Sequence, residues 1–353
     1  MSITVSSQRI NKNENSDNSK RKVIILGSAS SDLKAREIIN PRNKEEALSL
    51  YGNSELYRAY CLLFDMNVPN IYTCNCWSES DYLRAIDKIL HYDFDFLIPI
   101  GLYLSDKFYN PIVDTNEYYA EYFVRQLAEV NSLTTVLMTE RHASLYEDFD
   151  SFMLTMSEIE NNFITSLNIR NKKFLMEYGN NLNFVFNNIK DLEYSNVLLA
   201  GLYCTRDFAN YFPDVNHMSV VYHLNNIDVQ GMRGIYFKYN YYTNTITVEN
   251  PLNFKTELDI YANALIDDTI KMTIRVVDLN KYKGMLYTPY VCMQIKDDVS
   301  KSLNKISGRL IKTYKINNIS FKKTGPTSGY IIADYSITPY GTLENINVIM
   351  GAI

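Results

Sequence analysis

Apolar and polar residues alternate along this chain at two different periods. The run from Lys22 to Ser30 begins with consecutive apolar residues, which is typical of a strand buried on both faces. After Ser54, apolar residues recur at helical spacing instead and form one stripe, made of Leu56, Ala59, Tyr60, Leu63 and Phe64. The two periods predict strands over residues 22–30, 71–74, 94–100, 133–138 and 183–186, and helices over 43–51, 115–130 and 196–208, after Ser54 and Ser78, and from Phe152 to Leu167. We therefore predict an α/β fold over residues 22–210, a mixed sheet flanked by helices.

The pattern changes after Pro213. Residues 218–224 and 235–248 are rich in Tyr and Val and are predicted as strands or a long loop region. A helix is predicted over 257–266 and a strand over 270–277. A longer helix over 291–311 would turn five residues inward: Ile295, Val299, Leu303, Ile306 and Leu310. With a strand at 316–321, this portion is predicted to be α+β.

The last stretch, residues 330–353, alternates strictly. Ile331, Ala333, Tyr335 and Ile337 fall on one side of a predicted strand. Pro339 cannot donate to a ladder and Gly341 relaxes φ, so the strand should end there and the two residues could act as a hinge. A second alternation then places Ile346, Val348 and Met350 on one face. This terminal strand can close the sheet of its own subunit, or it can add to the sheet of a neighbour.

The other end of the chain resembles an arm. Ile3 and Val5 flank Thr4 and could form one short strand, and residues 11–22 are almost wholly polar. A disordered tail is the alternative interpretation. The chain is therefore divided into an N-terminal arm (1–21), an α/β domain (22–212), a Tyr-rich β insertion (213–255), a C-terminal α+β domain (256–338) and a C-terminal strand arm (339–353), with both arms extended.

Composition narrows the class of function. The 353 residues are 46% hydrophobic, which suffices for a sizeable core, and the net charge of -5 gives no basic field to recruit nucleic acid or an acidic membrane. We see no apolar run long enough for direct membrane insertion and no signal peptide. Five cysteines are an odd, sparse number that fits free thiols in a reducing compartment.

Candidate chemistry is sparse. Gly27 to Ser30 follows a strand, but the spacing is that of neither common phosphate-binding loop. Cys74 and Cys76 have no second pair to complete a zinc site, and we interpret them as thiols on opposite faces of a strand end. His217 and His223 would share a strand face, but no third ligand is signalled. We therefore predict no catalytic residue, no metal and no cofactor, although scattered residues could form a site on folding.

Several segments together resemble the contractile tail sheath family of phages, tailocins and related injection machines. The opening VIILGSAS, the Tyr51-Gly52 pair and the helix and strand that follow resemble that family's start. LAGLYCTRDFANYF, with Ala200-Gly201 and Asp207, resembles a second segment, and the C-terminal run with Thr338-Pro339, Glu344 and Ile346 resembles the family's closing strands. One departure is Asn67-Val68-Pro69, which stands where the family has a double glycine.

The resemblance implies a structural protein without catalysis. Such subunits assemble as hexameric rings, stacked helically around a tail tube, together with baseplate and tail terminator proteins. Terminal arms add strands to neighbouring subunits, which here would be Ile3, Val5, Ile346, Val348 and Met350. The resemblance further implies a virion tail or tailocin particle that is assembled in the bacterial cytoplasm. Two alternatives stay open: a baseplate or cap component of the same machine, and a cytoplasmic α/β enzyme with its site near Gly27 or Gly101.

Overall fold

The computed structural model describes two compact units, one within residues 21–249 and one within 280–339. Described are residues 21–139 except 113, 131 and 133; 182–205 except 188, 190 and 191; 234–240; 245–249; 280–308 except 283; 311–323; and 329–339. The predicted helix from Phe152 to Leu167, the strand at 218–224, the helix at 257–266 and the strand at 270–277 lie outside these ranges. The division of the chain into five segments stays a prediction.

The first unit is built on an eight-stranded mixed sheet in the order β10-β9-β8-β7-β4-β1-β3-β2. The six strands from β9 to β3 pair in parallel, and β10 and β2 add antiparallel edges. The strands are β1 (Lys22–Gly27), β2 (Ile38–Ile39), β3 (Asn70–Asn75), β4 (Phe96–Pro99), β7 (Thr135–Thr139), β8 (Leu182–Val185), β9 (Gly234–Asn240) and β10 (Thr245–Glu249). The predicted α/β fold with a mixed sheet is confirmed.

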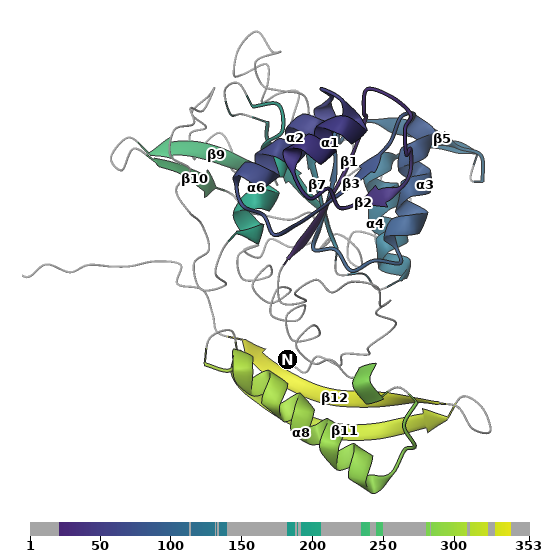
Figure 1. The fold of residues 1–353 in the computed structure, drawn as a ribbon, viewed down its shortest axis with the longest axis vertical. Helices are drawn as coiled ribbons and strands as arrows, with labels where there is room; N and C mark the ends of the chain where they lie inside the picture. Colours follow the sequence, from purple (N-terminus) through teal and green to yellow (C-terminus); the bar gives the residue numbers. More distant parts are fainter. Residues whose placement is uncertain are drawn as a thin grey trace, which may run out of the picture. The chain divides into compact units, whose positions relative to one another are not determined.

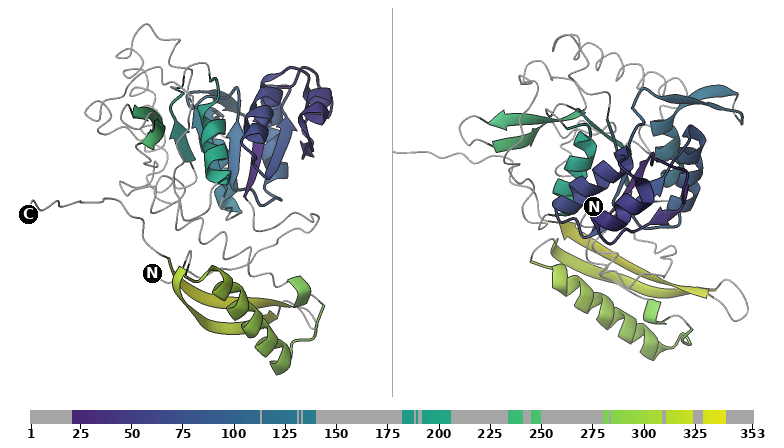
Figure 2. Two further views of the ribbon diagram at one scale, coloured as in Figure 1. Left: turned by 60° about the vertical axis from the view of Figure 1, so that its left-hand side comes forward. Right: turned by 45° about the horizontal axis from the view of Figure 1, so that its top comes forward.

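Helices cover both faces of this sheet (Figures 1 and 2). They are α1 (Lys44–Tyr51), α2 (Glu55–Asp65), α3 (Glu79–Ile89), α4 (Tyr119–Glu129) and α6 (Ser195–Cys204). The apolar residues of β1 explain the layers, because Ile24 and Leu26 pack with α3 and α4 whereas Val23 and Ile25 pack with α1, α2 and α6. A strand between two helical layers must be apolar on both faces, which is why β1 is an unbroken apolar run.

Helix ends follow local chemistry that the sequence carries. Asn43 and Ser54 accept hydrogen bonds from backbone N–H groups in the first turns of α1 and α2. Gly52 ends α1 with a φ of 61°, which favours glycine. A Cβ there would also lie only 2.7 Å from Ser30 Oγ, so both the backbone conformation and the space require glycine. Asn67 ends the turn after α2 with a φ of 59°. Asn tolerates this left-handed region, so the turn forms here without a glycine.

Two predicted helices have wrong bounds. Residues 115–118 form β6 (Thr115–Tyr118), which pairs with β5 (Lys107–Asn110), and α4 begins only at Tyr119. The predicted helix over 291–311 is α8 (Pro289–Ile306), so Leu310 lies beyond it. Gly308, with a φ of 82°, turns the chain there, and β11 begins at Ile311. At 115–118, pairing with the preceding strand β5 overrides a helix-like spacing of apolar residues, and after Ile306 the turn at Gly308 into β11 ends the helix.

Candidate assembly surface

Within the described residues, the second unit contains a long hairpin, one α-helix and one short 3-10 helix. Its elements are β11 (Ile311–Lys323), β12 (Gly329–Pro339), α8 and a short 3-10 helix, η3 (Asn280–Tyr282). β12 ends at Pro339, as predicted, where its partner on β11 is Ile311. Gly341 and the predicted arm residues Ile3, Val5, Ile346, Val348 and Met350 lie outside the described residues, so their role stays a prediction.

The hairpin has one apolar and one polar face. Tyr314 pairs with Ile337, Ile316 with Tyr335 and Ile319 with Ala333, and such directly opposite residues share a face. The predicted alternation of β12 is confirmed, because Ala333, Tyr335 and Ile337 are buried whereas Thr338 is exposed. The opposite face pairs Lys315 with Ser336, Asn318 with Asp334 and Ser320 with Ile332. One face is therefore suited to a helix and the other to solvent.

An irregularity keeps the two faces in phase. The register shifts between Ile316 and Asn318, so Asn317 is an extra residue on β11. A bulge of this kind adds twist and bends the strand. The Asn317 side-chain amide donates to Asp334 Oδ1 across the hairpin at 3.3 Å. Without the extra residue, every side chain beyond it would move to the other face.

Helix α8 covers the apolar face. Thr288 caps it by accepting from the Val291 N–H, and Pro289 occupies its first turn. Ile295, Val299 and Leu303 are fully buried. The Tyr314 hydroxyl, on the covered face, lies 2.9 Å from both Ser300 Oγ and Asn304 Oδ1. These contacts fix the position of α8 along β11.

The edges of the hairpin are open in the part of the chain that the structure describes. No described strand pairs with the outer edge of β11 or of β12, so two rows of backbone donors and acceptors face outward there. Such edges are templates for added strands. Four exposed lysines stand along β11: Lys312, Lys315, Lys322 and Lys323. Lysines on an edge discourage indiscriminate pairing.

The charge of this unit is opposite to that of the whole chain. Residues 280–339 contain ten Lys and Arg against three Asp and Glu, a net charge of +7, whereas the complete chain carries -5. The Lys281 ammonium forms an ion pair with Asp298 and lowers the pKa of that carboxyl, and Tyr282 donates a further hydrogen bond to it. A strand added along β11 therefore meets a basic surface.

The enzyme alternative requires an opening at the carboxyl ends of the strands. In sheets of this type, ligands bind where the strand order reverses, which here lies between β1 and β4. Side chains lie close to the end of β1 at this place. A Cβ on Gly27 would lie 3.5 Å from Leu56 and from Ile100, and the Tyr82 hydroxyl donates to the Ile100 carbonyl at 2.6 Å. Burial raises the pKa of Tyr82, so this hydroxyl stays protonated.

The candidate metal ligands do not converge in the described residues. Among them, no group of three or more His, Cys, Asp or Glu could hold a metal ion, and His217 and His223 lie outside them. The prediction that Cys74 and Cys76 occupy opposite faces is wrong. Both are buried in the cluster between the sheet and α3 and α4, because residues two apart in an extended segment share a face. Their shared burial raises the pKa of Cys76.

Comparison with solved structures reveals the same fold in proteins of contractile machines. A chain of the anti-feeding prophage baseplate, in a six-fold symmetrised cryo-EM structure, has a TM-score of 0.61 and 11% identity, with 99% of each chain covered. The sheath tail protein of Listeria innocua has a TM-score of 0.55 and 11% identity over 91% of this chain and 95% of its own. The sheath tail protein of Desulfitobacterium hafniense has a TM-score of 0.55 and 8% identity over 95% and 100%. No family model and no curated protein matches the sequence. Among the described helices, none is both long and apolar enough to cross a bilayer.

Proposed function

We propose that this chain, which has the fold of sheath tail proteins, is the structural subunit of a contractile tail sheath. It polymerises as hexameric rings around an inner tube, and contraction of the polymer drives the tube through a target cell envelope. The observation that supports this best is the β11–β12 hairpin, whose two outer edges are unpaired in the described residues. Helix α8 already covers one face of this hairpin, and its unpaired edges offer backbone donors and acceptors to further strands.

The terminal arms supply those strands in the proposed polymer. Ile3 and Val5 at one end, and Ile346, Val348 and Met350 at the other, add to hairpins of neighbouring subunits. The thirteen residues of β11 span roughly 43 Å, which is enough ladder for a firm junction. Glu344 gives the C-terminal arm a negative charge that suits the lysines of β11. Pro339 ends β12, so the chain can turn at Pro339 and Gly341 toward the next subunit.

Contraction in this proposal is a rigid-body rearrangement. Ladder hydrogen bonds between arms and hairpins persist while the polar linker at residues 11–21 and the hinge at Pro339 and Gly341 absorb the movement. Contacts between the larger units exchange from one packing to another and supply the free energy. The partners are further copies of this chain, the tail tube protein, and baseplate and tail terminator proteins. The subunit needs no catalysis or cofactor for this and resides in a virion tail or tailocin particle.

Electron microscopy of the full chain tests the proposal. Purified protein, alone or expressed with a tube protein, should form long rods or polysheaths. Ile346→Pro with Val348→Pro should abolish them, because proline removes the ladder N–H groups. The matched control, Ile346→Thr with Val348→Thr, keeps those groups and the β-branched shape and should still polymerise. Polymers from the proline variant would exclude the strand exchange, and a wild-type chain that never forms rods would exclude the sheath.

A baseplate or cap component is the second candidate. It is supported by the likeness to a baseplate chain over 99% of both chains. The two candidates differ in the extent of assembly, since a cap or baseplate component should stop at isolated rings. An enzyme is less well supported, because the structural likenesses are to sheath tail proteins and a baseplate chain. A small ligand that raises the melting temperature specifically would favour it.

A further inference from the structure

The two outer edges of the β11–β12 hairpin differ in how well they are protected (Figure 1). β11 carries four exposed lysines, and two of its residues, Lys312 and Asn317, have no residue directly opposite on β12. Extra residues and lysines both discourage another strand from pairing along an edge. β12 has neither, because its residues from Gly329 to Pro339 pair in unbroken succession and none is Lys or Arg. An added strand therefore meets fewer obstacles on β12.

The buried face of β12 determines how an added strand must be oriented. Ala333, Tyr335 and Ile337 are buried on the face that α8 covers, and Asp334 and Ser336 alternate with them. Residues directly opposite each other on neighbouring antiparallel strands share a face of the sheet. A strand beside β12 therefore continues the apolar face only if its own apolar residues stand opposite Ala333, Tyr335 and Ile337.

The sequence directly after β12 contains a turn signal. Residues 340–343 read Tyr-Gly-Thr-Leu. A two-residue turn of type II′ has glycine at its first central position, because φ is positive there, and its twist matches that of the antiparallel strands it joins. Gly341 and Thr342 fit the two central positions. The chain is thus suited to reverse direction after β12 and to run back along the outer edge of that strand.

This turn sets one register, because residues equally far from it stand opposite each other. The register puts every apolar residue of the alternating C-terminal arm opposite a buried residue of β12: Ile346 opposite Ile337, Val348 opposite Tyr335 and Met350 opposite Ala333. A turn longer by one residue would put the same three residues opposite the polar Thr338, Ser336 and Asp334 instead. The turn signal and the alternation of the two strands therefore agree on one pairing.

Pro339 is compatible with this pairing. In a two-residue hairpin, the residues that flank the turn exchange both backbone hydrogen bonds, and the next pair exchanges none. That next pair is Pro339 and Glu344, so the arm does not need the N–H group that Pro339 lacks. Pro339 is paired with Ile311 on its other side, which places Glu344 two strands from Ile311 and its exposed neighbour Lys312. Opposite charges at this separation attract each other within about one Debye length.

We propose that residues 343–350 of a free subunit pair with β12 of the same copy in this register, and that assembly exchanges the strand onto β12 of a neighbouring copy. The exchange rests on the proposed function, whereas the pairing within one copy does not. A tether as short as Gly341 and Thr342 gives the arm an effective concentration of about millimolar, so self-pairing prevails among dilute subunits. Exchange keeps the same ladder, as in domain swapping.

Disulfide trapping on the full chain tests the pairing. Ser336→Cys with Asn347→Cys puts two thiols opposite each other on the polar face, with Cα atoms about 5.5 Å apart, a separation that suits a disulfide. In monomeric protein, oxidation with diamide should link the two thiols within one chain. The control, Ser336→Cys with Val348→Cys, puts the thiols on opposite faces and should not link them. Mass spectrometry distinguishes these links from any to the native free cysteines.

The outcomes separate self-pairing, exchange and the sheath function. A link in the control, or no link within monomers of the test variant, would overturn the self-pairing. Rods assembled from isotope-labelled and unlabelled chains and then oxidised should carry the link between copies, and links only within copies would overturn the exchange. If rods never form, the exchange fails with the sheath function, while the monomer link still decides the self-pairing. Rods from subunits that never link as monomers would leave the sheath function intact and refute the self-pairing.

Matched variants of the turn add a quantitative test. Gly341→Val places a β-branched residue where the turn needs a positive φ, so the protection of residues 343–350 from hydrogen exchange in monomers should fall at least about fivefold. The control Thr342→Val places the same residue one position further on, where the turn has a negative φ, and should keep the protection of the wild type. Equal protection in the two variants would contradict the proposed turn.

Discussion

Truncating Leu303 to alanine should strongly destabilise the second unit while the first keeps its stability. Leu303 lies in the last turn of α8, is fully buried, and belongs to the stripe that covers the hairpin. A buried Leu→Ala substitution costs about 2–5 kcal/mol through lost transfer free energy and the cavity that remains. At about 0.05–0.15 kcal/mol per residue, residues 280–339 account for about 3–9 kcal/mol of the stability of their unit. The substitution thus removes a large part of the stability of residues 280–339.

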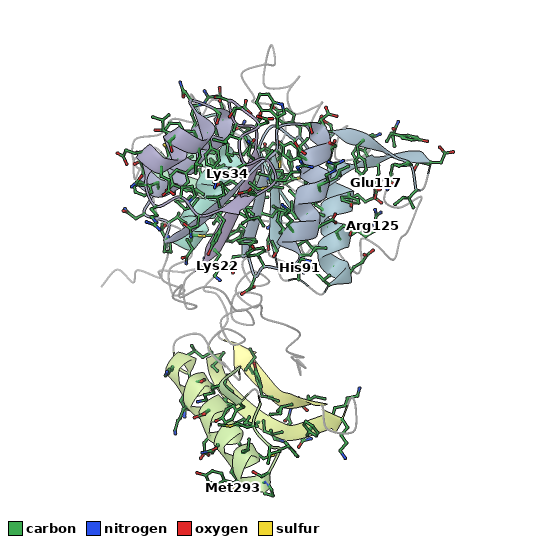
Figure 3. The ribbon with its side chains drawn as sticks, turned by 45° about the vertical axis from the view of Figure 1, so that its right-hand side comes forward. Lys22, Lys34, His91, Glu117, Arg125 and Met293 are labelled. Carbon is green, nitrogen blue, oxygen red and sulfur yellow. The ribbon has the colours of Figure 1, made fainter. Side chains whose placement is uncertain are left out.

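Hydrogen exchange with mass spectrometry on the full chain measures the effect. In Leu303→Ala, peptides from α8, β11 and β12 should lose protection by two or more orders of magnitude, because about 2.8 kcal/mol corresponds to a hundredfold change. Peptides from β1, β3 and β4 should keep theirs. The control Met293→Ala changes an exposed residue of the same helix, 64% exposed and labelled in Figure 3, and should leave all protection unchanged.

Two outcomes would contradict this reasoning. Equal loss of protection in both units would mean that they fold as one cooperative structure. Unchanged protection in α8 would mean that the hairpin and helix do not depend on each other. In the proposed polymer, Leu303→Ala should also prevent rods, because the acceptor hairpin would be lost.

Two further predictions concern single groups. Burial raises the pKa of Tyr335 to about 12, above an unfolded value near 10. The protonated Tyr335 hydroxyl therefore makes its full contribution to the free energy of unfolding below pH 10, and this contribution is lost as the pH rises toward 12. Between pH 9 and pH 11.5 the wild type should lose about 2 kcal/mol of unfolding free energy that Tyr335→Phe does not lose. The same exchange experiment at the two pH values measures this difference. An equal loss in both proteins would contradict the prediction. On α6, a Cβ at Gly201 would lie 2.5 Å from Met66 Sδ, so Gly201→Ala should destabilise the wild type by up to about 2 kcal/mol. In a Met66→Ala background, where Leu63 Cδ2 at 3.2 Å is the remaining close atom, the same substitution should cost at least about 1 kcal/mol less. Equal effects in urea denaturation of both backgrounds would rule out the contact with Met66.

The sequence by itself determined the elements whose causes are local. A continuous apolar run marked β1. Asn43, Ser54 and Pro339 marked ends of helices and a strand, because a cap or a missing N–H acts within a few residues. The alternation of Ala333, Tyr335 and Ile337 identified the buried face of β12 for the same reason. The α/β fold followed from the order of these elements.

Only the tertiary structure decided features that depend on which partner a segment meets. Residues 115–118 carry the spacing of a helix, but pairing with Lys107–Asn110 and the buried Glu117–Arg125 pair make them a strand. The spacing of apolar residues placed Leu310 in the stripe of α8. The chain turns at Gly308 instead, and this turn allows β11 to pair with β12. The sequence also could not predict that Ile112 and Trp77 are exposed, because burial depends on how the sheet and the helices pack together. Backbone groups bond to whichever partner the fold brings near, and a local pattern cannot name that partner.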